Sequence, residues 1–426
     1  MAEADRLPTI ADGLRIAARR FGTPLGVTDM ATLEASATEL AAAFPSPWLR
    51  QYSVKANDVG AIVARLGRLG LGANVVSSGE WAIARRAGIP NSRISLEGIG
   101  KTEADLAAVA RATGRGDPLL WTALESTDEA AALFKRAAPV VRRGSARLDV
   151  LLRFNPAVEP ETIAGLAVGA DTSKFGLADD ELAGAIEAGG GPDGPLRWRG
   201  IHLHVGSQLG AVDAWRDGVR RALALAALLG GSLPDFDTLD VGGGFPVFDI
   251  GTPVPRPERF AREFLGLLDA LPDDRRPVRL AVEPGRFLVA RAGILVARVL
   301  HVRQRPGPMV VLDAGMTELI RPALYGARHP VVALTSGGRP WDSAGGDDLR
   351  PTVVEGPACE STDAFGQHLL PPLARGDLVA IRDTGAYGAS LSSTYNGRPL
   401  AAQVLLEVDG SFVAARRRGG TSMIRR

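Results

Sequence analysis

The stretch Tyr52-Ser53-Val54-Lys55-Ala56-Asn57 places a lysine at the end of an apolar run that begins at Leu49. Lysine is scarce in this chain: it occurs only at positions 55, 101, 135 and 174, and arginine carries most of the positive charge. An amine in a partly apolar site loses proton affinity and can attack a carbonyl to form a Schiff base. The stretch therefore predicts a strand that delivers a reactive lysine. A surface lysine that merely closes a strand is the alternative.

Around this stretch, short apolar runs alternate with segments of helical periodicity. Strands are predicted at 49–56, 73–77, 94–97, 119–124, 150–154, 200–205, 236–241 and 278–283. The helices between them are predicted at 59–69, 79–87, 103–112, 127–138, 180–188, 214–229 and 257–270, after a first helix over 30–44 that Asp29 caps. Eight strands alternating with helices over about 250 residues are typical of a (β/α)8 barrel.

In such a barrel, functional side chains lie where the strands end at the C-terminal face. The predicted strand ends carry Lys55, Ser77, Glu97, Glu125, Arg153 with Asn155, His204 with Ser207, Gly242 to Gly244, and Glu283 with Arg286. Unrelated polar caps explain two or three such ends, but all eight are harder to explain in that way. The pattern therefore predicts one functional site at this face.

The second half of the chain has a different pattern. Strands separated by Gly, Pro and Asp are predicted at 293–302, 309–313, 331–334, 378–382, 403–408 and 411–415. We expect a barrel domain of residues 29–290 and an all-β domain of residues 1–28 and 291–426. A lone N-terminal strand at 23–27 is expected to join the sheet of the all-β domain, and this domain is expected to complete the active site. Residues 337–349 are expected to form a loop, and the basic tail 416–426 is expected to be mostly mobile.

Composition narrows the class of partner. The 426 residues are 46% hydrophobic and 23% charged, as in a globular protein with two domains. The net charge of +1, with acids and bases interspersed, argues against nucleic acid or an anionic membrane and favours a small molecule. Residues 1–7 lack a signal-peptide core, and the longest apolar run, 222–229, is too short to span a membrane, so a cytoplasmic protein is expected. The single cysteine, Cys359, excludes an internal disulfide and a multi-cysteine metal site.

Two of the strand ends predict a phosphate site. Gly242-Gly243-Gly244 ends the seventh strand and Glu283-Pro284-Gly285-Arg286 ends the eighth, and the loops after these strands are the usual phosphate site of the barrel. Bare glycine N–H groups can hold the phosphate. Because a phosphate would repel Glu283, this acid is expected to serve a protonated ring nitrogen instead. A structural pair of Glu283 with Arg286 or Arg153 is the alternative.

Two further motifs need an interpretation. His202 and His204 fall on the same side of a strand, and with no cysteine or acid at ligand spacing nearby we expect an aromatic stacking role and no metal. Gly98-Ile99-Gly100-Lys101-Thr102 is not a nucleotide loop, because that pattern needs glycine where Ser95 stands.

The second half holds a set of polar motifs. Its tyrosines fall in Arg321-Pro322-Ala323-Leu324-Tyr325, in Gly385-Ala386-Tyr387-Gly388 and in Tyr395-Asn396-Gly397-Arg398-Pro399. Gly356-Pro357-Ala358-Cys359-Glu360-Ser361 places the only cysteine beside an acid. By itself such a cysteine is more commonly a buried structural residue.

Together these motifs resemble the fold-type III pyridoxal-phosphate-dependent amino acid decarboxylases, and within them the diaminopimelate decarboxylase family. The resemblance covers nearly the whole chain in the right order: YSVKAN, VVSSGE, SKFG, HLHVGSQ, GGGF, EPGRFLVARAG, DAGM, RPALYGARHP, GPACES and GAYGASLSSTYNGRP. It implies a carboxy-lyase that converts meso-diaminopimelate to L-lysine and CO2, a reaction of lysine biosynthesis, with pyridoxal 5'-phosphate as cofactor.

The resemblance also implies roles for single residues. Lys55 would form the Schiff base, His204 would stack on the cofactor ring and Glu283 would pair with its nitrogen. The phosphate would be held by Ser207, Gly242, Gly243, Gly244, the backbone around Gly285 and Arg286, and Tyr387. Substrate binding would fall to Arg286, Arg321, Tyr325, Glu360 and Tyr387. Cys359 would donate a proton to the carbanion, and it would come with Glu360 from the partner subunit of a homodimer with shared active sites.

Departures from the family pattern leave the substrate open. Asn74 stands where these enzymes commonly have aspartate, Asn57-Asp58 replaces Asn-Pro, and Gly98-Ile99-Gly100 replaces an asparagine-rich form. None of them is expected to touch the cofactor chemistry. The alternatives are a paralogous decarboxylase of ornithine, arginine, a carboxylated polyamine or a specialised-metabolite or siderophore intermediate, a catalytically silent regulatory homologue, and an activity like that of alanine racemase.

Overall fold

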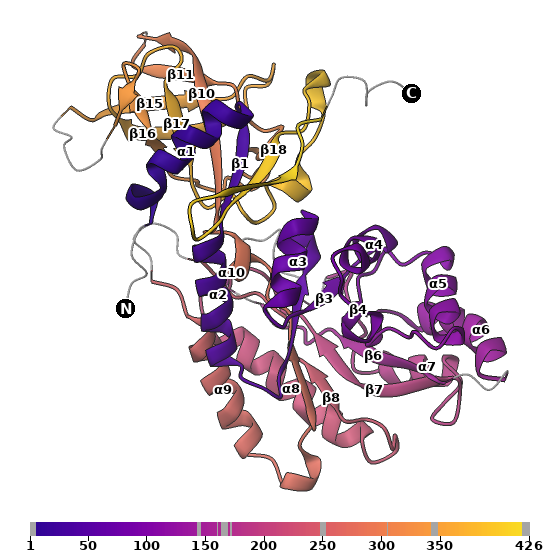
Figure 1. Cartoon of the computed structure of the whole chain (residues 1–426). Helices are drawn as coiled ribbons and strands as arrows, with labels where there is room; N and C mark the ends of the chain where they lie inside the picture. Colours follow the sequence, from indigo (N-terminus) through magenta and orange to yellow (C-terminus); the bar gives the residue numbers. More distant parts are fainter. Residues whose placement is uncertain are drawn as a thin grey trace. The chain divides into compact units, whose positions relative to one another are not determined.

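The computed structural model describes residues 6–142, 146–159, 161–162, 169–170, 173–247, 253–304, 306–341 and 348–419. The chain forms two compact units. The barrel unit is Ala37–Phe287, and the β unit combines Met1–Ser36 with Leu288–Arg426. Figure 1 labels the main helices and strands of both units.

Eight parallel strands close the barrel in sequence order, with the last paired to the first. They are β2 (Leu49–Ser53), β3 (Gly72–Val75), β4 (Ile94–Leu96), β5 (Trp121–Leu124), β6 (Leu148–Phe154), β7 (Leu196–Leu203), β8 (Thr238–Asp240) and β9 (Arg279–Val282). Trp121, Ala123, Leu151 and Ala281 pack together as a buried cluster of these strands. The predicted (β/α)8 barrel with a second, sheet-rich unit is confirmed.

The predicted helices are present, and their ends lie within four residues of the predicted ones. They are α2 (Met30–Ala43), α3 (Gly60–Arg68), α4 (Ser78–Arg86), α5 (Glu103–Gly114), α6 (Thr127–Arg142), α7 (Glu181–Ala188), α8 (Asp213–Leu229) and α9 (Pro257–Asp269). Side-chain caps explain several starts: the Asp29 carboxylate accepts a hydrogen bond of 2.6 Å from the Thr32 hydroxyl, and Thr102 forms a capping box with Asp105.

The β unit is built on a nine-stranded sheet. Its strands are β1 (Leu25–Asp29), β10 (Gly293–Arg303), β11 (Met309–Leu312), β12 (Val331–Ala333), β15 (Arg350–Glu355), β16 (Ala364–Leu370), β17 (Leu378–Ile381), β18 (Ala402–Leu406) and β19 (Phe412–Arg416). The short strands β13 (Thr335–Ser336) and β14 (Arg339–Pro340) form a separate pair. The N-terminal strand β1 lies antiparallel to β10 and parallel to β18, so residues far apart in sequence share one sheet.

Several elements of the β unit were not predicted. The helix α1 (Leu7–Phe21) packs the buried side chains of Leu14 and Ala17 into one hydrophobic core with β1 and β18, although the buried Arg15 and the exposed Arg19 and Arg20 obscure the apolar face in sequence. The short helix α11 (Arg321–Tyr325) was also missed, as were β15 and the sheet-edge strand β16. The two strands contain Pro351 and Gly366, residues that are depleted in strands.

The expected mobile tail is partly wrong. Arg416 ends β19, and the Arg418 guanidinium donates to the Pro24 carbonyl oxygen at 2.8 Å. Residues 420–426, like 342–347 of the predicted loop, lie outside the described residues. In the described parts of the chain, no helix has both the length and the apolar character needed to cross a membrane.

Candidate active site

Lys55 follows directly after the end of β2. The strand stops at Ser53, and Lys55 lies in a single 3₁₀ turn, Val54–Ala56, rather than in the longer strand that was predicted. The turn is fixed on both sides: the Tyr52 hydroxyl donates to the Asn57 carbonyl oxygen at 2.9 Å, and the Ser53 hydroxyl donates to the Glu283 carbonyl oxygen at 3.1 Å. The Lys55 side chain is exposed between buried neighbours, and its expected placement in a partly apolar environment stays a prediction.

The three-glycine turn after β8 packs against neighbouring backbone so closely that only glycine fits. A Cβ at Gly242 would lie 2.4 Å from the Leu203 carbonyl oxygen, and one at Gly243 would lie 2.2 Å from the Glu283 carbonyl oxygen. Gly242 and Gly244 also have positive φ angles of 69° and 98°. The turn is therefore a backbone cradle of the kind that suits a phosphate, and its role as the phosphate site stays a prediction.

Two other candidate residues meet beside this turn. Arg286, a buried residue that begins the helix α10 (Arg286–Val289), donates from Nη2 to the Ser207 hydroxyl at 3.1 Å and from Nε at 3.3 Å. The Gly243 N–H donates to His204 Nδ1 at 3.2 Å, which holds the imidazole against the glycine turn. A Cβ at Gly285 would lie 3.1 Å from Cβ of Ser53, so this segment also approaches the β2 end closely.

A buried cluster of acids and one imidazole lies across the strand ends. His202 Nε2 is 3.2 Å from Glu97 Oε2 and 3.4 Å from Glu283 Oε2, and all three residues are buried. The Asn74 amide donates to Glu283 Oε1, and the Trp121 indole N–H lies 3.5 Å from Glu97 Oε1. The sequence placed Glu97 at a strand end and His202 beside His204, but nothing in the strand pattern brought the two together.

This cluster corrects two expectations. Asn74 touches Glu283, so this departure from the family pattern falls on the residue expected to serve the cofactor ring. Arg153, offered as a structural partner of Glu283, pairs with Glu125 at 3.4 Å. Glu97, His202 and Glu283 each offer one atom that could bind a metal ion, and these three atoms lie within 4.8 Å of one another. A cation could therefore bridge them. The expectation that the site takes no metal stays a prediction.

Burial sets the charges of the cluster. It raises the pKa of Glu97 to about 7, and the nearby Glu283 carboxylate adds to this effect. Burial likewise lowers the pKa of His202 to about 4 and raises the pKa of Asp240 well above its ordinary value. The His204 ring keeps part of its exposure, yet loss of solvation lowers its pKa well below the usual value. At neutral pH both imidazoles are therefore uncharged, and Glu97 changes protonation close to pH 7.

The glycine and lysine stretch after β4 has a structural role. The Lys101 ammonium is fully buried, pairs with Glu129 at 2.8 Å and also donates to the Gly98 carbonyl oxygen. The lysine of this stretch is therefore held by a carboxylate of the same unit. That the stretch is not a nucleotide loop stays a prediction.

The candidate residues of the β unit are exposed or partly exposed. Cys359 and Glu360 are exposed in the segment after β15, so the alternative of a buried structural cysteine is wrong. The Tyr395 hydroxyl donates to Glu360 Oε1 at 2.5 Å. Arg321 Nη1 lies 3.0 Å from His329 Nε2.

Tyr325 and Tyr387 both lie next to left-handed backbone. Tyr325 ends α11, and the following Gly326 caps this helix with φ 61°. Tyr387 itself has φ 60°, an uncommon conformation for a residue of its size. Backbone strain of this kind is often found at functional positions.

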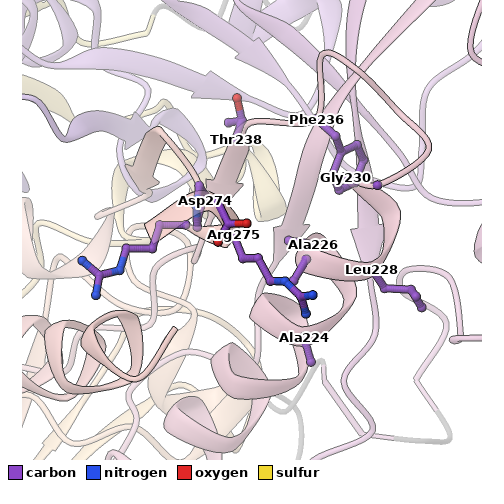
Figure 2. A pocket seen from close by; sticks show the side chains of 12 residues that line it. Ala224, Ala226, Leu228, Gly230, Phe236, Thr238, Asp274 and Arg275 are labelled. Atoms are coloured by element: carbon purple, nitrogen blue, oxygen red, sulfur yellow. The ribbon is translucent and has the colours of Figure 1, made fainter. Parts of the chain in front are cut away.

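A large cavity lies elsewhere on the barrel. Its volume is about 610 Å³, and it is lined by the end of α8, by Thr238 and by the segment Asp274 to Pro277. Figure 2 shows these side chains. Thr238 begins β8, whereas the glycine turn follows the end of that strand. The cavity therefore opens at the opposite end of the barrel from the candidate site, where this fold rarely places its chemistry.

The site can be tested against the cofactor that the sequence suggests. A lysine at a strand end, a glycine cradle that any Cβ would fill, and a buried carboxylate beside it are the three features that pyridoxal phosphate requires for its aldehyde, its phosphate and its ring nitrogen. The residues present therefore fit this group.

Comparison with known proteins agrees with the site. The family model of the pyridoxal-binding domain of pyridoxal-dependent decarboxylases matches residues 30–290. The chain belongs to the pyridoxal-dependent decarboxylases, and the resemblance inferred from its motifs is confirmed.

Among the curated relatives are diaminopimelate decarboxylases. That of Aquifex aeolicus is 33% identical over 410 residues, which cover 95% of this chain and 91% of the relative. That of Actinosynnema pretiosum subsp. auranticum is 36% identical over 400 residues, which cover 90% and 84%. The solved diaminopimelate decarboxylase of Helicobacter pylori, in complex with L-lysine, superposes with a TM-score of 0.85 at 28% identity and covers 96% of this chain and 98% of that structure.

Proposed function

We propose that this protein is a pyridoxal-phosphate-dependent carboxy-lyase that converts meso-diaminopimelate to L-lysine and CO2. The observation that carries the proposal is the meeting of Lys55, the glycine cradle and the buried Glu283 at one end of the barrel. Relatives named diaminopimelate decarboxylase, which align over almost the whole chain, support this choice of substrate.

Barrel residues would bind and orient the cofactor. Lys55 would hold it covalently through its amine, His204 would stack on its ring, and the phosphate would lie in the cradle of Gly242 to Gly244. Ser207, with Gly285 and Arg286, would complete the phosphate site. When bound, the cofactor supplies an electron sink for the pair of electrons that the departing carboxylate leaves behind.

Glu283 would keep a proton on the ring nitrogen, since a buried carboxylate favours a positive partner. The Asn74 amide donates to one oxygen of Glu283, and this contact orients the carboxylate. Arg286, buried and permanently charged, is proposed to bind both the phosphate region, through Ser207, and a carboxylate of the substrate.

For the β unit, the proposed roles rest on the motifs. Tyr387 would bind the phosphate and the substrate. Arg321 and Tyr325 would bind the distal carboxylate, for which the planar guanidinium is suited. Glu360 would bind the distal ammonium.

Cys359 would donate a proton to the α-carbon. We further propose that Cys359 and Glu360 act in the partner subunit's site, which would make the enzyme a homodimer, and that it works in the cytoplasm.

The test is an incubation of the purified protein and pyridoxal phosphate with meso-diaminopimelate, ornithine, arginine, lysine and carboxylated polyamines, with CO2 and product identity measured. Lysine from diaminopimelate alone is the expected result. Activity only on another amino acid would move the protein to a specialised branch. Cofactor binding without any CO2 would point to a regulatory homologue, and racemised product without CO2 would point to a racemase.

A further inference from the structure

We propose that Asp363 is a positioning residue that fixes the turn carrying Cys359 and Glu360. The inference rests on the proposed function, because it concerns the residues that would deliver the proton and bind the distal ammonium. It adds a residue to which none of the sequence motifs assigned a role.

Asp363 holds the turn at several points. Its Oδ2 accepts from the Ala358 N–H at 2.6 Å, and its Oδ1 accepts from the Met316 N–H at 2.6 Å. Its own backbone closes the segment, because the Gly356 N–H donates to the Asp363 carbonyl oxygen at 2.7 Å and the Asp363 N–H donates to the Glu360 carbonyl oxygen at 3.1 Å. One side chain thus links the turn after β15 to the loop after β11.

The slot around this carboxylate admits little else. A Cβ on Gly315 would lie 2.3 Å from Asp363 Oδ1, and a Cβ on Gly356 would lie 2.1 Å from the same atom. Asp363 itself is only 2% exposed. Asparagine has one acceptor oxygen, so it would turn its NH2 group toward one of the two N–H donors. Glutamate would be too long for the slot.

The consequence lies in the exposed residues. Cys359 and Glu360 are exposed, so packing of their side chains does little to fix them. Their direction depends on the backbone of the turn, and that backbone depends on Asp363. A shift of about 1 Å at a reacting group can lower a rate about 100-fold.

The same unit offers a matched control. Asp377 is also buried, at 1% exposed, and also accepts from backbone N–H groups, those of Gly337 at 2.9 Å, Gly338 at 2.8 Å and Ala374 at 2.7 Å, as well as from the Thr335 hydroxyl at 2.8 Å. It holds a different turn. Replacement by asparagine should therefore damage the fold to a similar degree at both positions but disturb the Cys359 turn only in D363N.

Because Cys359 is the only cysteine, its reaction with an aromatic disulfide reports this turn alone. In D363N we expect the thiol to react about tenfold faster in a loosened turn and kcat for diaminopimelate to fall about 100-fold, with a smaller change in KM. In D377N both quantities should stay within about twofold of the wild type, with a comparable loss of thermal stability. An unchanged thiol rate and kcat in D363N, or equal changes in D377N, would overturn the proposal.

A second variant covers the case in which D363N fails to fold. G356A keeps the Asp363 carboxylate but places a methyl group 2.1 Å from the present position of Asp363 Oδ1, so the same changes in thiol rate and kcat are expected. The control is G307A, where a Cβ meets nothing within 4 Å, and it should match the wild type. A G356A protein that behaves like G307A contradicts the proposal. If the wild type releases no CO2 from diaminopimelate, the proposed function fails, yet the thiol rates still decide the role of Asp363.

Discussion

The barrel end and the Cys359 turn place functional groups in opposite ways. In the barrel, Glu97, His202 and Glu283 are buried and contact one another, so each fixes the position and charge of the next. In the β unit, Cys359 and Glu360 are exposed, and the Tyr395 hydroxyl donates to the Glu360 carboxylate from another segment. Groups that are proposed to hold a charge on a ring have a dry, rigid setting, whereas groups that are proposed to reach a substrate depend on the backbone that carries them.

The largest effect is expected where the cofactor would be held covalently. K55A should lower CO2 release about 1,000-fold or more and abolish the absorbance of a lysine-bound cofactor, because Lys55 lies in the turn directly after β2, whereas Lys101, in the loop after β4, is held by Glu129. K135A, which changes an exposed lysine on α6, is the control and should match the wild type. If the absorbance of the K55A protein is unchanged, Lys55 does not hold the cofactor.

The glycine cradle gives the next largest effect. G243A places a Cβ 2.2 Å from the Glu283 carbonyl oxygen, so the turn must shift, and the affinity for pyridoxal phosphate should fall about 10- to 100-fold by fluorescence titration. G266A in α9 meets nothing within 4 Å and should bind the cofactor normally, with a gain of about 0.5–1 kcal/mol in stability from its better helix propensity. Equal affinities in the two variants would show that the turn does not hold the phosphate.

The comparison also explains what sequence could predict. The barrel could be predicted because short apolar runs typical of strands alternate with segments of helical periodicity. The grouping of the polar strand ends then followed, because parallel strands end at the same edge of the barrel. The Glu97–His202–Glu283 cluster did not follow, since it depends on which side chains in β7 and directly after β4 and β9 turn toward one another across the barrel. The hydrogen bond of Asn74 to Glu283 was missed for the same reason.

The β unit was harder to predict. Its motifs were found by resemblance. The strand β16 at the sheet edge, however, shows a poor alternation of buried and exposed residues, and α1 combines an apolar face with several arginines. The role of Asp363 could not be found at all, because it rests on two backbone N–H groups, one of them 47 residues away.

The charge of the Glu97–His202–Glu283 cluster is expected to have a moderate effect on the stability of the fold. Burial raises the pKa of Glu97 from 4.5 to about 7, so between these values the folded protein binds a proton that the unfolded chain has lost. Stability from this group therefore falls as the pH rises from 4.5 through 7, by about 3 kcal/mol at most. The lowered pKa of His202 acts in the opposite direction between about 4 and 6.5, where the unfolded chain binds the extra proton.

E97Q separates the two contributions. Glutamine cannot ionise, so the apo variant should gain stability relative to the wild type as the pH rises from 5 to 8, by about 2 kcal/mol in urea denaturation. The His202 contribution should remain in both proteins. Two parallel stability curves across this range would mean that Glu97 is ionised throughout and that burial does not set its charge.

The smallest effect is expected at the exposed end of the comparison. Y395F removes the hydroxyl that donates to Glu360 Oε1 at 2.5 Å. The same contact raises the pKa of Tyr395, because Glu360 favours the protonated phenol. Since both groups are in contact with water, their bond is weak, and the variant should raise KM for diaminopimelate about threefold while kcat stays within about twofold. Steady-state CO2 release gives both constants. A fall in kcat as large as that expected for D363N would mean that Tyr395 acts on the proton donor as well, and that the exposed groups are as tightly coupled as the buried ones.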